Sequence, residues 1–315
     1  MGNVFYPAGQ SVAADAAFTD WLRIREEAFK SATPMLKSWG IMDERTTMER
    51  VYYQPVGPVA LGEDVTIADG DPMPTGGIQG YHLTGTCVKR GVKGLRLMEE
   101  DRLQSRIPYT NMNVQAYGRA EKLYEDKKGI QALQAGTTQT GFDNVAFFST
   151  SHPRDPLKPG VNLQSNSFTL ALTPDNLATV IATVLDWEAE NGDPLWSGIE
   201  PEFMLLVPPA LRAQAHKAVD RENVVEGGAA VENISKGAAE VKVIKQLKSD
   251  PTRWYLVIKN AGTKPLCRVV YRPRQRFDLG PGSDLFQKTQ IVELASNEWT
   301  DYRTWDWRTA VTSKP

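Results

Sequence analysis

The feature that most constrains this chain is a long helix-compatible run over residues 108–136. Pro108 suits a first helical turn, where a missing N–H does no harm, and Gly136 suits the position just past a last turn. Gly118 and Gly129 each cost about 1 kcal/mol relative to Ala, so packing must hold the helix. At 1.5 Å per residue it would span roughly 42 Å, more than the width of a small domain. Its apolar residues follow intervals of three, four or seven, which predicts one buried face: Tyr109, Met112, Ala116, Ala120, Leu123, Ile130 and Leu133.

The composition is that of a soluble globular chain. Its 315 residues and 41% hydrophobic content suffice for about two lobes with cores of their own. No apolar run approaches the roughly 20 residues of a membrane span and the start lacks a signal peptide, so no membrane partner is expected. The net charge of −2 argues against general affinity for nucleic acid. Cys87 and Cys267 lie far apart without a CxxC motif, which predicts reduced core thiols.

Before the long helix, the pattern predicts an arm helix over residues 11–31 and then a projecting ribbon. Residues 49–56 and 81–98 alternate as strands, and the loop of more than 20 residues between them is unusual inside a compact domain. A lone hairpin is marginal in water, so a neighbouring subunit is the expected support. An ordinary disordered loop is the alternative. The ribbon would have an acidic tip with Glu63, Asp64, Asp69 and Asp71, and a basic stem with Lys89, Arg90, Lys93 and Arg96.

After the long helix, the chain reads as an α/β lobe followed by strands. Thr173, Pro174 and Asp175 open a helix as cap, first-turn proline and dipole-matched acid. Residues 203–207 form an apolar strand and the next residues start another helix, a βαβα-like pattern. Residues 221–239 are rich in Gly and Ala, which predicts a mobile loop. Further strands are expected at residues 240–247, 253–259, 266–272, 287–294 and 299–311, the last pinning the chain end into a core through Trp305 and Trp307.

The known patterns of nucleotide binding and nucleophilic catalysis are absent. The sequence has no GxxxxGK[ST] motif and no GxGxxG motif after a strand. Ser151 and His152 invite a nucleophile interpretation, but adjacent residues seldom aim their side chains at one another, and there is no GxSxG elbow. We therefore predict that the chain is not an enzyme and takes no cofactor.

The sequence does not predict a metal site either. His82, His152 and His216 stand in separate predicted elements without ligand spacing. Asp69 and Asp71 resemble the start of a calcium loop, but the twelfth position is a glycine where a bidentate Glu is needed.

Four arginines crowd nine residues on and just after the predicted strand 266–272: Arg268, Arg272, Arg274 and Arg276. Such a row could contact phosphate, or it could meet the acids of a neighbouring subunit. With Asp64, Asp69 and Asp71 of the tip and the four basic residues of the stem, these arginines are candidate inter-subunit contacts.

The order of these elements resembles the major capsid protein of tailed phages with the Hong Kong 97-type fold. More narrowly, the chain resembles the major head subunit of Mu-like phages, through AFFSTSHP (residues 146–153), IEPEFMLLVPPALRAQAHKAV (199–219) and WYLVIKNAGTKPLCRVVYRPRQR (254–276). The resemblance implies an α+β fold and a subunit that assembles into hexamers and pentamers. These would close an icosahedral shell around double-stranded DNA, in the virion.

The resemblance also implies a division of the chain. Residues 1–45 would be the N-terminal arm and 46–103 the extended ribbon called the E-loop. A peripheral domain with the spine helix would take residues 104–173 and 261–315, and an axial domain residues 174–260.

Departures from the family sharpen the expected partners. Some relatives carry a scaffolding segment of about a hundred residues before the ribbon, whereas 45 residues precede it here, so a separate scaffold protein is expected beside a portal. A decoration protein and weak contact with packaged DNA are further expected partners. A covalent Lys–Asn cross-link cannot be placed on this sequence. An encapsulin-like nanocompartment shell and, from a different class, a cytosolic α/β enzyme are the alternatives.

Overall fold

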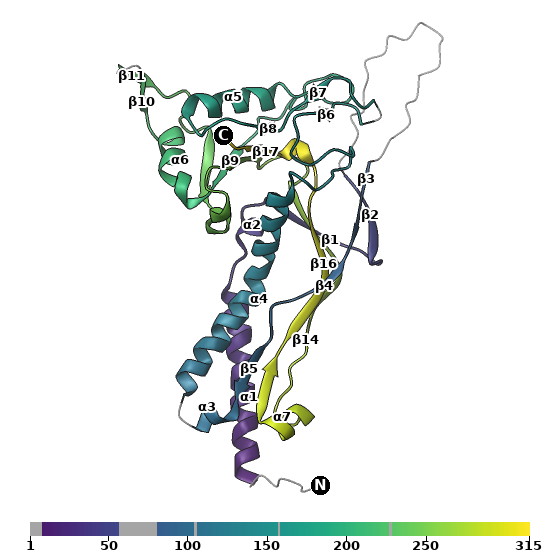
Figure 1. The fold of residues 1–315 in the computed structure, drawn as a ribbon, viewed down its shortest axis with the longest axis vertical. Coiled ribbons are helices and arrows are strands. Elements are labelled where there is room, and N and C mark those ends of the chain that lie inside the picture. The colour runs from purple at the N-terminus through teal and green to yellow at the C-terminus, as the bar shows by residue number, and fades with distance from the viewer. Residues whose placement is uncertain (1–7, 57–80, 104–105, 157, 227–228) are drawn as a thin grey trace.

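The computed structural model describes residues 8–56, 81–103, 106–156, 158–226 and 229–315. Figure 1 shows an elongated molecule, with a compact lobe at one end and a long arm of paired helices and strands running away from it. The N-terminal end lies at the far end of the arm and the C-terminus lies in the compact lobe. None of the helices in this described part of the chain combines the length and the apolar character that a bilayer crossing requires.

Two long helices, α1 (Ala8–Ser31) and α4 (Ile107–Ala135), lie side by side along the arm and run in the same direction (Figure 1). Both were predicted, with α4 displaced by one residue from the expected range. The interior glycines of α4 permit this packing, since a Cβ on Gly118 would lie 2.5 Å from the carbonyl oxygen of Arg25. Likewise, a Cβ on Gly129 would collide with Leu36 of the short helix α2 (Met35–Ser38).

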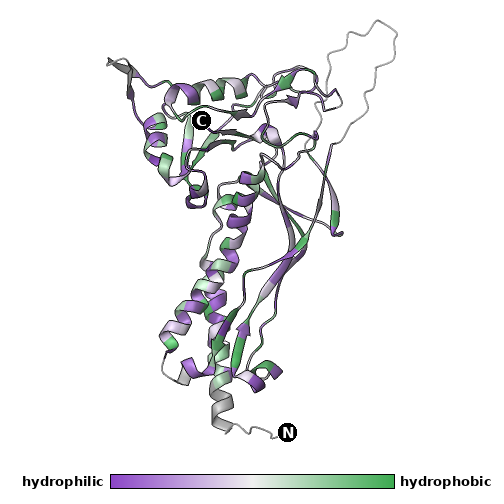
Figure 2. Cartoon of the chain, viewed as in Figure 1, coloured by the Kyte–Doolittle hydropathy of each residue, from purple (hydrophilic) through white to green (hydrophobic). Residues whose placement is uncertain are grey.

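The face that α4 buries differs from the prediction. Ile130 and Leu133 are buried as expected, but Tyr109, Met112, Ala116, Ala120 and Leu123 are exposed. The first half of α4 instead packs against α1 through the apolar Val114 and Tyr117, the small Gly118 and the buried Arg25–Glu121 pair. In Figure 2, hydrophilic and apolar residues accordingly alternate along both helices.

The strands of the arm form a sheet of order β1-β14-β16-β4, built on the long antiparallel pair β14 (Leu266–Arg276) and β16 (Ser296–Thr304). β1 (Met42–Thr46), which sequence patterning missed, pairs parallel with β14, and β4 (Val88–Arg90) pairs with β16. At the far end, β5 (Leu95–Met98) pairs with β15 (Ile291–Leu294), beside α3 (Glu99–Leu103) and α7 (Asp284–Thr289).

The two strands at the base of the predicted ribbon are present. β2 (Val51–Pro55) and β3 (His82–Thr86) pair antiparallel as a separate two-stranded sheet at the side of the arm (Figure 1). Behind it, Cys87 and Cys267 are buried and free, as predicted, and burial raises the pKa of the Cys267 thiol to about 12. Both thiols are therefore core groups rather than nucleophiles.

The compact lobe is built on a sheet of order β12-β9-β13-β17-β8. β9 (Phe203–Val207) and β12 (Ala239–Val243) pair parallel, with α6 (Arg212–Val219) between them in the chain, whereas the predicted strand near Phe168 is separated from β9 by two other strands of the sheet. β13 (Trp254–Ile258) lies antiparallel to β9. α5 (Pro174–Leu185) has the predicted cap, since Thr173 accepts from the backbone N–H of Asn176. Short elements complete the lobe: β6 (His152–Pro153), β7 (Leu163–Gln164), η1 (Pro209–Leu211) and η2 (Lys245–Ser249).

The lobe also takes strands from outside residues 174–260. β8 (Ser167–Phe168) and β17 (Ala310–Ser313) both belong to its sheet. The last strand was predicted as one piece over residues 299–311, but the 3-10 turn η3 (Trp307–Thr309) separates β16 from β17. Asp306 caps that turn by accepting from the backbone N–H of Arg308. Trp305 and Trp307 are buried, so the chain end is pinned as expected.

The predicted loop over residues 221–239 contains a hairpin instead. β10 (Asn223–Glu226) and β11 (Ala229–Glu232) pair antiparallel, with Glu226 opposite Ala229. The signal was in the sequence, because two short β-compatible runs separated by Gly-Gly are typical of a tight hairpin.

Candidate functional site

The stem of the ribbon packs one face on the subunit and leaves the other exposed. Tyr52 is 1% exposed, and its hydroxyl donates to Asp301 Oδ2 at 2.9 Å. Burial and the Asp301 carboxylate raise the pKa of Tyr52, so the hydroxyl stays protonated. On the opposite face, Tyr53 is 68% exposed and Val51 is 50% exposed. That face is available to another molecule.

The acidic tip of the ribbon, with Glu63, Asp64, Asp69 and Asp71, lies outside the described residues. Its role as an inter-subunit contact therefore stays a prediction.

The basic residues assigned to the ribbon stem lie on the body of the subunit instead. Lys89 and Arg90 belong to β4, which pairs with β16, and Arg90 contacts Asp301 at 3.5 Å. Arg96 belongs to β5 and pairs with Glu293 at 3.1 Å. Lys93 lies between these strands and is exposed. The second strand was too long in the prediction because the chain passes from the ribbon into β4 at Cys87 without a turn signal, and Gly91 and Gly94 before β5 were not interpreted as a break.

The four arginines of β14 differ in what they contact. Arg268 is 7% exposed and contacts Glu298 at 2.7 Å, Glu44 at 3.0 Å and Glu125 at 3.4 Å. Arg274 contacts Glu298 at 3.0 Å and Arg276 pairs with Glu26. Arg272 is exposed and lies over the ring of its neighbour Tyr271. Within this row, Arg272 has the most freedom to reach another subunit.

Glu298 is the centre of a buried polar cluster that the sequence did not reveal. Its Oε2 accepts from Arg268 and Arg274, and its Oε1 accepts from the hydroxyls of Tyr302 at 3.1 Å and Thr300 at 3.3 Å. Burial alone would lower the pKa of Arg268, but the surrounding acidic groups outweigh it and raise that pKa above its ordinary value. The arginines on one face of β14 thus hold the arm together from inside.

A second buried pair joins α1 to α4. Arg25 binds Glu121 of α4 in a bidentate contact, with distances of 2.7 and 2.6 Å, and reaches Asp278 at 2.6 Å. Both Arg25 and Glu121 are essentially inaccessible to solvent. Paired guanidinium and carboxylate groups fix orientation as well as contact. Helix α1 therefore packs against its own subunit.

His152 belongs to a buried hydrogen-bonded cluster rather than to a nucleophile pair. Its Nδ1 lies 2.6 Å from Asp143 Oδ2, and its Nε2 lies 3.2 Å from both the Phe147 carbonyl and Asn166 Oδ1. Its ring stacks on Trp307 with centroids 4.2 Å apart. Ser151 is exposed, and its hydroxyl contacts Ser149 instead. This cluster links the chain segment after α4 to Trp307 in η3, directly before the last strand β17.

We predict that His152→Ala lowers stability without removing a catalytic activity. The change leaves Asp143 buried with one remaining backbone donor, and opens space beside Trp307, so a loss of about 3 kcal/mol is expected. The matched control is His216→Ala, because His216 is 45% exposed and pairs with Asp220 on the helix surface, a contact worth about 0–1 kcal/mol. Thermal unfolding measures both. A hydrolytic turnover that the wild type shows in an esterase, phosphatase or protease screen and the His152 variant lacks would contradict the structural role.

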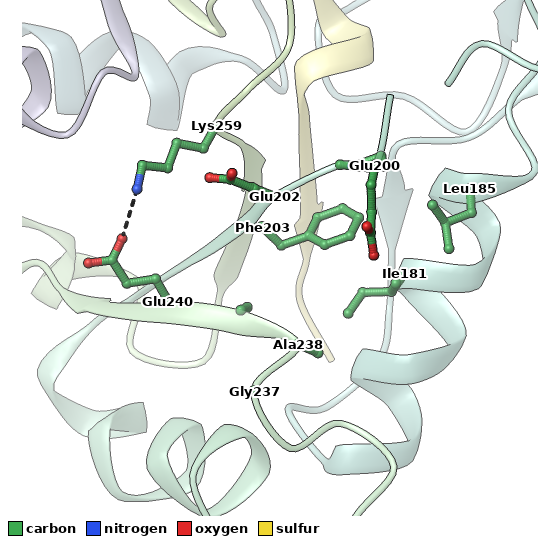
Figure 3. Close-up of a pocket in the computed structure, with 11 residues that line it drawn as sticks. Ile181, Leu185, Glu200, Glu202, Phe203, Gly237, Ala238, Glu240 and Lys259 are labelled. Atoms are coloured by element: carbon green, nitrogen blue, oxygen red, sulfur yellow. Dashed lines mark ion pairs between the residues drawn. The ribbon is translucent and has the colours of Figure 1, made fainter. Parts of the chain in front are cut away.

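A hollow of about 590 Å³ lies in the compact lobe, between α5 and the ends of β9 and β12 (Figure 3). Phe203 and Ile181 form part of its apolar wall, and Lys259 points toward Glu240 across it at 3.6 Å. The hydrogen bond from Lys242 lowers the pKa of Glu240, which makes this carboxylate a weak base. The lining of the hollow therefore combines apolar side chains with ion-paired charged side chains, as in a solvated surface pocket.

No protein-family model matches the chain, and no curated protein matches it. Solved structures do match over most of its length. The capsid of cyanophage P-SCSP1u is 12% identical, with a TM-score of 0.56 over 90% of this chain and 88% of that one. The mature capsid of bacteriophage PhiM1 is 10% identical, with a TM-score of 0.55 over 90% and 87%. A virus-like particle from Pyrococcus furiosus is 12% identical, with a TM-score of 0.50 over 94% and 99%.

These likenesses define the class of fold. The chain has the α+β fold of Hong Kong 97-type capsid proteins, which confirms the predicted fold class. The arm helix α1, the ribbon β2–β3, the spine helix α4 and the compact lobe are the parts of that fold.

Proposed function

We propose that this chain is the major capsid subunit of a tailed phage. It forms hexamers and pentamers that close an icosahedral head around double-stranded DNA, and its place is the virion. The observation that carries the proposal is the agreement with phage capsids over about nine tenths of both chains. The ribbon stem supports it, because its exposed face, with Tyr53 and Val51, needs a cover from a neighbouring copy.

The proposed contacts between copies join the acidic tip of one ribbon to basic residues of the next subunit. Lys89 and Arg272 are the best placed of the predicted residues, because they are exposed and form no ion pair within the described part of the chain. Arg268 and Arg274 would act on assembly indirectly, by keeping the arm rigid. A separate scaffold protein, a portal, a decoration protein and weak contact with packaged DNA belong to the same proposal.

Within the tailed phages, we propose a head of the Mu-like type. The support is the sequence resemblance in residues 146–153, 199–219 and 254–276. The first stretch contains His152 and its buried cluster, the second contains β9 and α6, and the third contains β13 and β14. These elements form the framework of the compact lobe and the arm. A cryo-electron microscopy structure of the assembled shell tests this through its capsomer contacts, and contacts unlike those of Mu-like heads would reject it.

An encapsulin-like nanocompartment shell is the second candidate. The observation in its favour is the particle from Pyrococcus furiosus, which matches 94% of this chain and 99% of its own. The two candidates differ in content, because a phage head holds nuclease-protected DNA when it is filled, whereas a nanocompartment holds cargo protein.

The purified protein should sediment as capsomers or shells rather than as a 35.0 kDa monomer, and negative-stain microscopy should show closed particles. A shell subunit buries much of its surface against copies of itself, so association is expected without any substrate. Sedimentation velocity over a range of concentrations measures this. A chain that stays monomeric at every concentration, together with turnover on small polar substrates, would favour the cytosolic enzyme instead.

A further inference from the structure

Helix α4 sorts its charges in an unusual way. Its only carboxylates, Glu121, Glu125 and Asp126, are 0%, 4% and 1% exposed and face the interior of the subunit. All of its basic side chains, Arg119, Lys122, Lys127 and Lys128, are exposed or half-buried. A solvated helix face normally mixes both signs of charge. The exposed part of α4 therefore carries basic side chains and no carboxylate.

The same outer face carries an apolar stripe. Tyr109 is 64%, Met112 67% and Leu123 40% exposed, and the exposed alanines Ala116 and Ala120 stand between them. The intervals of three and four residues place these five side chains on one line along the helix, over roughly 21 Å. The small residues in the middle would allow a second helix to approach closely. This stripe is the face that the sequence predicted to be buried.

The stripe leads into a groove of about 890 Å³. Its lining includes Ala120, Leu123 and Ile130 of α4, Lys93 of the β4–β5 connection and Lys248 of η2. Lys127 lines it as well, and carboxylates are absent from the lining. Lys93, Lys127 and Lys248 form no ion pair within the part of the chain that the structure describes.

Lys128 follows the groove residue Lys127 in the chain and is half-buried. Burial lowers the pKa of Lys128, and the positive charges of Arg90 and Lys127 lower it further. Like charges that depress one another are relieved by a negative partner. Such a partner would also cover Met112 and Leu123.

Two other occupants fit less well. The α4 face of a second copy carries the same basic groups, so two such faces repel one another. The phosphate backbone of nucleic acid would satisfy the lysines, but it would leave the apolar side chains Tyr109, Met112 and Leu123 uncovered.

We propose that the outer face of α4 and the adjoining groove bind an acidic amphipathic helix of a separate protein. The apolar side of that helix lies on the stripe from Tyr109 to Leu123, and its carboxylates meet Lys93, Lys127 and Lys248. The inference goes beyond the proposed function, because the surface belongs to the single subunit and its occupancy does not depend on shell closure.

The test uses the full chain, taken as the unassembled fraction from size-exclusion chromatography. The probe is a fluorescent synthetic peptide of about four heptads, with Leu at the two seam positions and Glu at the exposed ones. Three further probes are the same peptide with Lys in place of Glu, a duplex DNA, and a synthetic peptide of residues 57–80. Fluorescence anisotropy measures binding. The variants are Met112→Asp with Leu123→Asp on the stripe, and Lys93→Glu with Lys127→Glu in the groove. Ile234→Asp, at a 73% exposed site in the compact lobe, is the matched control.

We expect the acidic peptide to bind the wild type and the Ile234 control equally, and to bind both other variants at least tenfold more weakly with unchanged circular dichroism. Added salt should weaken binding, and the Lys peptide should not bind. Absence of binding to the wild type, or equal binding to every variant, would overturn the proposal. Preferred binding of DNA that is lost in the groove variant would assign the face to nucleic acid. Tighter binding of the residue 57–80 peptide would assign it to the ribbon of a second copy.

Discussion

Replacing residues 59–77 by a short Gly-Ser turn should give a folded, soluble subunit that no longer closes into shells. The stem does not need the replaced residues, because the Val56 N–H donates to the Tyr81 carbonyl at 2.9 Å and Tyr52 and Leu83 are buried against the arm. The contacts expected to fail are those between copies. Each exposed ion pair is worth only about 0–1 kcal/mol, but one contact repeated around a ring and over a shell accumulates. Electron microscopy and sedimentation measure the loss.

Two further variants separate length from charge in the ribbon. A Gly-Ser segment of the same length as residues 59–77 keeps the span and removes the chemistry, so it should fail like the short turn. Reversing Asp64, Asp69 and Asp71 to Lys keeps the length, and should weaken assembly most at low salt, where charges are screened least. Normal particles from the shortened variant would show that the ribbon is not the contact that holds neighbouring subunits together.

The elements that sequence patterning predicted are those whose signals are local. The start of α4 follows from Pro108 and its end from Gly136, and the cap of α5 follows from Thr173. The ribbon followed from alternation on both sides of a long acidic loop. The hairpin of β10 and β11 was local as well, but the Gly-Gly pair was interpreted as flexibility rather than as a turn.

The buried face of α4 could not be predicted, because its partners are far away in the sequence. Glu121 is buried only because Arg25, 96 residues earlier, reaches it. Asp126 is buried because it accepts from the backbone N–H groups of Met35 and Leu36 at the start of α2. A periodicity rule assigns apolar residues to the core, and here paired charges took that place. The local hints of packing on that side were the interior glycines and the apolar Val114 and Tyr117, which are buried against α1.

The candidate contacts between subunits divide in the same way. A row of arginines on a strand predicts a charged surface, yet Arg268 lies in the first half of β14, which is buried on both faces, and contacts Glu298, Glu44 and Glu125 there. Which arginine finds acids inside its own subunit depends on the register of β14 with β16 and on α4, and neither was available from local pattern. Arg272 avoids the interior because it lies at a register shift between the two strands.

Glu298→Ala should destabilise the subunit by about 3–5 kcal/mol, because it leaves buried guanidinium groups without their carboxylate. Glu298 is 1% exposed and is the acceptor that Arg268, Arg274, Tyr302 and Thr300 share. The matched control is Glu293→Ala on β15, whose partner Arg96 is 68% exposed, so that change should cost about 0–1 kcal/mol. Urea unfolding followed by tryptophan fluorescence compares the two midpoints.

Glu298→Gln refines this prediction, since the amide oxygen can still accept a hydrogen bond while the negative charge is lost. Its cost should fall between those of the two alanine variants, because the hydroxyls of Tyr302 and Thr300 keep an acceptor while Arg268 retains Glu44 and Glu125. Among the described residues, the other hydrogen-bond acceptor of the Arg274 side chain is the backbone carbonyl of Glu121. The loss of the Glu298 charge should therefore destabilise the contact between β14 and α4 most. Hydrogen exchange should then rise first in β14, β16 and the adjoining half of α4. Equal midpoints for Glu298→Ala and Glu293→Ala would mean that the arm is held by its apolar contacts alone.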